Sequence, residues 1–178
     1  MSEPIIRPVA ETDTAAIASI YEYHVLHGTA TFDTVPLNIE ETRKKIADIA
    51  LKQAPFLVIE QDNAVVGYAY ATNFRDRAAY SFACENSIYI HPQFIGQGIG
   101  RALLASLLQK AEDCGFLQMI AVIGGGEPAS VALHASAGFA HAGRMKSVGR
   151  KFGQWLDTVY MQRALGQGES VAPPSEPQ

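Results

Sequence analysis

Residues 86–108 place a strand, a glycine-rich loop and a helix in direct succession, and this order constrains the rest of the chain. An apolar run over residues 87–90 leads through a His-Pro pair into residues 96–100, where every second residue is glycine, and leucines then recur at helical spacing. The first N–H groups of a helix have no partner inside the helix, and glycine lets a phosphate group come close to the backbone. The pattern therefore predicts a phosphate site at the start of the helix, although a tight turn without a ligand would have the same residues.

Two well-known phosphate loops do not match these glycines. A P-loop requires Gly-x-x-x-x-Gly-Lys-Ser/Thr, and no Lys-Ser or Lys-Thr pair follows here. A dinucleotide fingerprint requires Gly-x-Gly-x-x-Gly, but after Gly96 and Gly98 the third position is Arg101. The residues around the loop must therefore decide its role.

Length and charge bound the class of protein. A chain of 178 residues suits one domain, expected over residues 1–165, and the Gly, Ser, Pro, Gln and Glu that follow predict a disordered tail over residues 166–178. A formal charge of −4 argues against a nucleic-acid partner, and no apolar run reaches the roughly 20 residues that span a bilayer. The first residues lack a secretion signal pattern, so we expect a cytoplasmic protein. Cys84 and Cys114 form no close pair, which favours neither a disulfide framework nor a metal site.

Apolar spacing and turn residues predict the remaining elements. One helix is expected after side-chain capping groups at residues 12–14, and a second opens at Asn38, with Glu41 at capping-box spacing. A short helix around Ser130 follows three consecutive glycines. The expected strands cover residues 5–9, 56–60, 65–71, 87–90, 119–123 and 156–161, with another starting at residue 139.

Residues 72–80 gather arginine and aromatic side chains in a compact cluster. Arg75 and Arg77 could bind a carboxylate or phosphonate through forked hydrogen bonds, and a solvated loop is the alternative. Glu85 follows within a strand, next to the apolar Cys84. A buried carboxylate without a partner is costly, so Glu85 is either exposed or functional.

The order of these elements, with QGIGRAL at residues 97–103, resembles the GNAT family of acetyl-CoA-dependent N-acetyltransferases over about residues 4–163. The resemblance implies an α/β (α+β) GNAT fold, in which helices flank a single mixed central sheet and a pair of strands splays at the acetyl-CoA site. The family's loop pattern, Gln/Arg-x-x-Gly-x-Gly/Ala, falls on Ile95, Gly98 and Gly100. Ile95 departs from this pattern, which removes one side-chain contact to the pyrophosphate but leaves the backbone amides.

Within that family, four stretches are similar to the phosphinothricin and methionine sulfoximine acetyltransferases: residues 75–80, 85–90, 130–134 and 149–157. The resemblance implies acetyl transfer to a small amino acid analogue such as L-phosphinothricin, methionine sulfoximine or methionine sulfone. The amino group would attack the thioester directly, with Glu85 as the general base. An enzyme for another amine, such as a protein N-terminus or a polyamine, and a non-catalytic acyl-CoA-binding module are the alternatives.

The resemblance also implies the residues of the site, a homodimer and no metal. Acetyl-CoA, the co-substrate, is expected to contact Ile88, Tyr89, Ile90, Gly96, Gln97, Gly98, Ile99, Gly100, Arg101, Glu127 and Ser130. The amino acid is expected to contact Phe32, Phe74, Arg75, Arg77, Tyr80 and Glu85. Glu127 replaces an Asn that is common in the family, and an ionised carboxylate cannot donate a hydrogen bond. His134 occupies the position of a tyrosine acid in many relatives, so it either protonates the leaving thiolate or packs.

Overall fold

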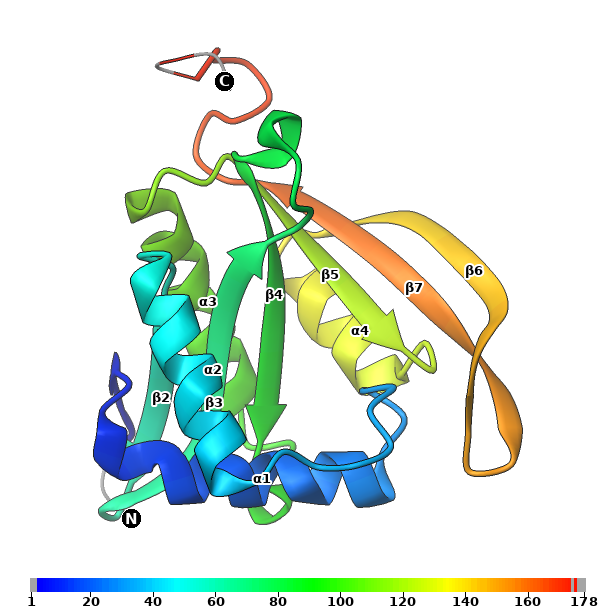
Figure 1. Ribbon diagram of the computed structural model, residues 1–178. Coiled ribbons are helices and arrows are strands. Elements are labelled where there is room, and N and C mark those ends of the chain that lie inside the picture. Colours follow the sequence, from blue (N-terminus) through cyan, green and yellow to red (C-terminus); the bar gives the residue numbers. More distant parts are fainter. Residues whose placement is uncertain (1–2, 174, 176–178) are drawn as a thin grey trace.

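The computed structural model describes residues 3–173 and 175, and it contains a seven-stranded sheet with helices on both faces (Figure 1). The strands are β1 (Ile5–Pro8), β2 (Phe56–Gln61), β3 (Ala64–Asn73), β4 (Ala83–Ile90), β5 (Gln118–Gly124), β6 (Ala140–Lys151) and β7 (Gln154–Ala164). Their spatial order is β1-β2-β3-β4-β5-β7-β6. Among the described strands, β4 and β5 pair in parallel, and all other neighbours are antiparallel. The predicted single mixed sheet is confirmed.

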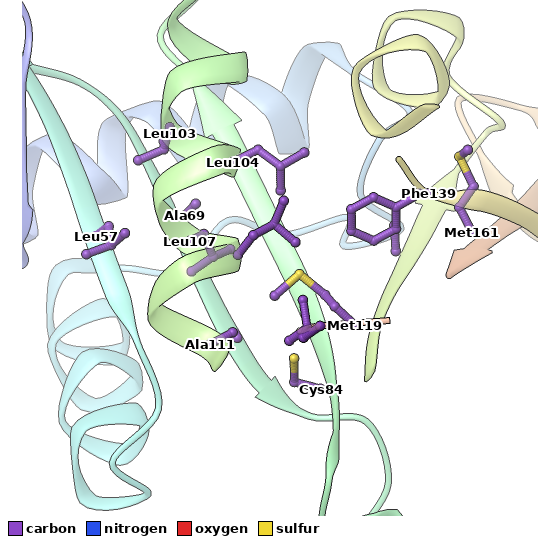
Figure 2. Packing of buried hydrophobic residues seen from close by; sticks show 14 of the residues in the cluster. Leu57, Ala69, Cys84, Leu103, Leu104, Leu107, Ala111, Met119, Phe139 and Met161 are labelled. Carbon is purple, nitrogen blue, oxygen red and sulfur yellow. The ribbon is translucent and has the colours of Figure 1, made fainter. Parts of the chain in front are cut away.

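The α-helices of the described residues are α1 (Thr14–His27), α2 (Ile39–Leu51), α3 (Ile99–Asp113) and α4 (Pro128–Ser136). On one face of the sheet, α1 and α2 pack their apolar residues against aromatic side chains of β2 and β3. On the other face, the leucines of α3 are fully buried against the strands, and α4 joins the same cluster (Figure 2). The leucine spacing therefore predicts the buried side of α3 correctly, and this packing fixes the start of α3 relative to β4.

The two predicted helix caps have different outcomes. At α2, the N–H of Glu41 donates to Asn38 Oδ1 (2.9 Å) and the N–H of Asn38 donates to Glu41 Oε2 (2.8 Å), so the capping box is confirmed. At α1, Asp13 makes no side-chain cap bond. Its carboxylate instead accepts hydrogen bonds from Arg7 of β1 at 2.7 and 2.9 Å. The expected cap of α1 at residues 12–14 is therefore wrong, because the oxygens of Asp13 are used by Arg7, six residues earlier, and by the N–H of Ala10 (2.8 Å) at the start of the 3₁₀ turn Glu11–Asp13.

A gap opens between β4 and β5. Their pairing covers residues 83–86 of β4 and 118–121 of β5 and extends no further within the described part of the chain. Beyond that point the two strands diverge (Figure 1). The predicted splayed pair is thus present, and the diverging end of β4 is the part that leads towards the glycine loop.

The last two strands form a long twisted arm beside the gap (Figure 1). β6 and β7 join through Phe152 and Gly153, which both have positive φ angles, of 50° and 74°. After β7, the carbonyl of Gly168 accepts a hydrogen bond from Gln118 Nε2 at 3.4 Å. Disorder of residues 166–178 stays a prediction, and residues 174 and 176–178 lie outside the described part of the chain. None of the described helices is long and apolar enough to cross a membrane.

Candidate active site

The gap between β4 and β5 is bounded by both strands, by α4 and by the segment that joins α1 to α2. Its lining includes Ala30, Ile88, Tyr89, Ile123, Ser130 and His134. Ile88 and Tyr89, two of the expected cofactor contacts, lie on the β4 wall of the gap. Ser130 and His134 of α4 line the same gap.

The hydrogen bonds between β3 and β4 show which amides of β4 face the gap. The N–H of His91, just beyond β4, donates to the carbonyl of Val66 at 2.8 Å. Because peptide groups alternate along an antiparallel strand, odd-numbered residues here turn their N–H and C=O towards β3. Ile88 and Ile90 consequently present theirs to the gap. The peptide group of Tyr89 faces β3 instead, although Tyr89 lines the gap, and its contact with acetyl-CoA stays a prediction.

The glycine loop is open in front of the N-terminus of α3. Gly96 and Gly98 have φ angles of 81° and 83°, and a Cβ added at either would meet no atom within 4 Å. Gly98 is the N-cap of α3 in the left-handed conformation. Gln97 turns its side chain back onto the loop, donating to the carbonyl of Gln93 at 2.9 Å. Free space, positive φ angles and unsatisfied first-turn N–H groups fit a phosphate-bearing ligand, and Ile95 beside them is exposed.

Glu85 lies on β4 directly opposite Thr72 of β3. Side chains alternate along a strand, so Glu85 shares a face with Tyr89, which packs on the α1 and α2 side. Burial raises the pKa of Glu85, and the nearby positive charge of Arg75 partly opposes this rise. The carboxylate therefore lies on the α1 and α2 side of β4, one residue before the pairing with β5 ends, with the raised pKa of a candidate base.

The arginine-aromatic cluster lies beside Glu85. The rings of Phe74 and Tyr80 meet edge to face with centroids 5.8 Å apart, and the guanidinium of Arg75 lies 4.9 Å from the centroid of Phe74. Arg77 precedes the 3₁₀ turn Ala78–Tyr80, and both arginines are exposed. The structure thus brings Phe74, Arg75, Tyr80 and Glu85 together, with Arg77 on the same exposed segment.

His134 is almost fully buried, with 2% of its surface exposed. Its Nδ1 lies 2.8 Å from the carbonyl oxygen of Ser130, and its Nε2 lies 3.0 Å from Asn86 Oδ1. Asn86 in turn donates from Nδ2 to the carbonyl of Ile120 at 3.2 Å. Burial lowers the pKa of His134, and the hydrogen bond to Ser130 opposes this change. The ring therefore ties α4 to both strands at the point where they begin to separate.

Glu127 has a structural partner at the start of α4. Its Oε2 accepts a hydrogen bond from the N–H of Ser130 at 2.7 Å and caps the helix. The carboxylate that replaces the family's Asn thus satisfies a first-turn amide of this helix.

Phe32 lies against the β6–β7 arm. A Cβ added at Gly149 of β6 would come within 2.5 Å of its ring, so the absence of a side chain at position 149 is what makes room for Phe32. This placement connects the segment between α1 and α2 with the arm, away from α3.

Two further residues belong to the site without having been expected there. Asn86 links His134 to β5, and His24 of α1 donates from Nε2 to the carbonyl of Ile90 at 2.8 Å. The polar run Glu85-Asn86-Ser87 in an otherwise apolar strand is a signal that could have pointed to Asn86. His24 carries no such signal, because its partner is a backbone atom 66 residues away. In the described residues, no group of three or more His, Cys, Asp and Glu side chains could hold a metal ion.

Comparison with known proteins agrees with this geometry. The model of the acetyltransferase (GNAT) domain matches residues 6–160. The phosphinothricin N-acetyltransferase of Alcaligenes faecalis is 47% identical over 169 residues, covering 94% of this chain and 86% of that protein. The L-methionine sulfoximine/L-methionine sulfone acetyltransferase of Salmonella typhimurium is 36% identical over 162 residues, covering 91% and 95%.

A solved structure shows the same arrangement. The GNAT superfamily phosphinothricin acetyltransferase of Sinorhizobium meliloti, in complex with AcCoA, superposes with a TM-score of 0.94 at 43% identity, covering 97% of this chain and 94% of that one. With the family model spanning most of the chain and the splayed strands and glycine loop in place, this chain belongs to the GNAT family of acetyltransferases.

Proposed function

We propose that this protein transfers the acetyl group of acetyl-CoA to the amino group of a small amino acid analogue such as L-phosphinothricin, methionine sulfoximine or methionine sulfone. The observation that carries the proposal is Glu85, whose pKa is raised by burial, next to the positive charge of Arg75 and one residue before the pairing of β4 with β5 ends. The names of the relatives point to the same substrates.

Different residues are proposed to hold acetyl-CoA and to accept the proton of the amino group. Acetyl-CoA supplies an acyl group activated as a thioester, and the glycine loop and the N–H groups of Ile88 and Ile90 are the donors available to hold it. An amino group with a pKa of about 8 or higher is mostly protonated at neutral pH, so a base must accept its proton. Glu85 is that base in our proposal, directly or through a water molecule. An amide donor aimed at developing negative charge is typically worth roughly 100- to 1000-fold in rate.

His134 is the proposed acid for the leaving thiolate. Both of its ring nitrogens face oxygen atoms, of Ser130 and Asn86, so the doubly protonated ring would have a hydrogen-bond acceptor on each side. Burial acts in the opposite direction, because it lowers the pKa of the ring. A packing role is the competing assignment, and the kinetics of a His134 variant separate the two.

The acceptor is tested by the rate of thiol release from acetyl-CoA with a panel of amines. We expect turnover with the named amino acids and none above background with a polyamine or an N-terminal peptide. Changing Arg75 and Arg77 together to Gln should raise KM for the amino acid about 10- to 100-fold, since charge-assisted hydrogen bonds contribute about 1.5–3 kcal/mol. Arg43→Gln, on the exposed side of α2, is the control. If only the peptide or the polyamine were acetylated, the proposed amino acid substrates would be wrong. If acetyl-CoA bound but no amine were acetylated, the protein would be a non-catalytic acyl-CoA-binding module.

The glycine loop is tested by adding one methyl group. Gly98→Ala should raise the dissociation constant of acetyl-CoA about 10-fold, or about 1.4 kcal/mol, because the methyl would occupy the open space before α3 and because φ = 83° strains an L-residue. Gly115→Ala at the other end of α3 is a matched control, with φ = 88° and equally open surroundings. Isothermal titration measures the dissociation constant of acetyl-CoA for each variant. Equal values for Gly98→Ala and Gly115→Ala would contradict a role for the loop in binding.

A homodimer and a cytoplasmic location are further parts of the proposal. Met145, Val148, Phe152 and Trp155 expose apolar surface along the β6–β7 arm, where a second copy of the chain could bury it. Sedimentation velocity at micromolar concentration tests this, and a monomer mass throughout would contradict the dimer.

A further inference from the structure

Lys151, the last residue of β6, is a buried lysine, and no carboxylate of residues 3–173 is bonded to it. Only 4% of its surface is exposed. Its Nζ donates to the carbonyl oxygens of Gly28 and Thr31, each at 2.9 Å. Burial lowers the pKa of Lys151, and Asp33 opposes this change through its charge. A buried ammonium needs hydrogen-bond acceptors in place of water, so the two carbonyls explain why this charge is tolerated.

The segment that Lys151 holds crosses the open end of the gap. We call residues 28–33 the crossing loop; in Figure 1 it rises from the end of α1 towards β5 and α4. Its contacts with β5 are so close that a Cβ at Gly124 would lie 2.8 Å from the carbonyl oxygen of Thr29. Towards β4, Ala30 of the loop lines the same cavity as Ser87, Ile88 and Tyr89. The crossing loop therefore lies beside both strands that bound the gap.

We propose that Lys151 is a positioning residue, whose ammonium fixes the crossing loop over the end of the β4–β5 gap and so positions Phe32 of that loop, an expected contact of the amino acid acceptor. This inference rests on the proposed acetyl transfer. Neighbouring contacts agree with a fixed loop: Tyr21 of α1 hydrogen-bonds both Thr31 and Asp33. Those contacts orient side chains, whereas Lys151 binds the two backbone carbonyls on either side of Ala30.

The test combines kinetics with hydrogen exchange. Lys151→Met should raise KM for the amino acid about 10-fold, the equivalent of about 1.4 kcal/mol, and should raise KM for acetyl-CoA less, although Ala30 of the crossing loop lines the gap. Amides of residues 28–33 should exchange faster in the same variant, and those of α3 should not. Lys151→Arg, which keeps a cation that donates hydrogen bonds, should restore most of the acceptor affinity. Lys146→Met changes an exposed lysine of the same strand and should leave every quantity at the wild-type value.

A purely structural role is separated by a second destabilised variant. Leu57→Ala removes a buried side chain of β2, outside the crossing loop, and should lower Tm without a change in acceptor KM. The proposal is overturned if Lys151→Met has wild-type KM and exchange, or if Leu57→Ala raises acceptor KM as much. If Lys151→Met does not fold, Lys151→Gln, which keeps one donor group, is compared with the wild type and Leu57→Ala in its place. Absence of turnover in the wild type would contradict the proposed function, and the exchange experiment would still decide whether Lys151 fixes the loop.

Discussion

Glu85→Gln is expected to lower kcat by roughly 100- to 10,000-fold, the usual contribution of a general base, while the dissociation constant of acetyl-CoA stays the same. The amide has nearly the shape of the carboxylate but cannot accept the proton that the amino group must lose. Stopped assays of thiol release give kcat, and titration with acetyl-CoA gives the affinity. Glu22→Gln, on the exposed side of α1, is the matched control and should behave as the wild type. Unchanged kcat in Glu85→Gln would remove Glu85 from the mechanism.

The pH dependence of the wild type gives an independent check on Glu85. A base works in its deprotonated form, so kcat/KM should fall as the pH drops through the pKa of Glu85, and burial places that fall at a higher pH than for an ordinary glutamate. Arg75 lowers this pKa, and Arg75→Gln should therefore move the fall of kcat/KM on the acidic side of the pH profile to still higher pH. In Glu85→Gln this fall of kcat/KM at low pH should disappear. If the fall persists unchanged in that variant, the titrating group is not Glu85.

His134→Gln is expected to lower kcat about 100-fold, the lower end for acid catalysis, with little change in KM for either substrate. A glutamine amide can still donate to Asn86 Oδ1, so the network at the start of the gap retains one of its bonds, whereas the titrating ring is lost. Thermal unfolding measured on the same samples separates the two roles of the residue. A variant with reduced Tm and wild-type kcat would assign His134 to packing alone and leave the thiolate to another donor. Ser136→Ala, an exposed change on the same helix, controls for disturbance of α4.

Local patterns predict the elements well where neighbours in sequence decide them. The leucines of α3 have the spacing of a one-sided helix, and Asn38 with Glu41 forms a cap from residues three apart. Asp13 carries the same kind of local signal, but its carboxylate bonds Arg7 of the preceding β1 and the N–H of Ala10 instead of an N–H of α1. The strand from residue 139 was likewise predicted only at its start, because its length to Lys151 depends on pairing with β7.

The residues of the candidate site also differ in whether local sequence or distant contacts reveal them. Glu85, the arginines of residues 72–80 and the glycine loop are recognised from residue type and spacing. The amides that face the gap depend on the pairing of β3 with β4, which assigns Ile88 and Ile90 to the gap and Tyr89 to the ladder. The role of His24 depends on a carbonyl 66 residues away.

By itself, the sequence determined the family and pointed to the glycine loop and the candidate base, because each of these depends on residue types at short, regular spacing. Only the tertiary structure decided which groups meet at the gap. Lys151 shows the reason most clearly: a lysine in a strand is usually exposed, and its burial follows from folding the β6–β7 arm against carbonyls of residues 120 and more positions away. Hydrogen-bond geometry between distant backbone atoms has no local sequence pattern, and so the part of the site built from it becomes visible only in the folded chain.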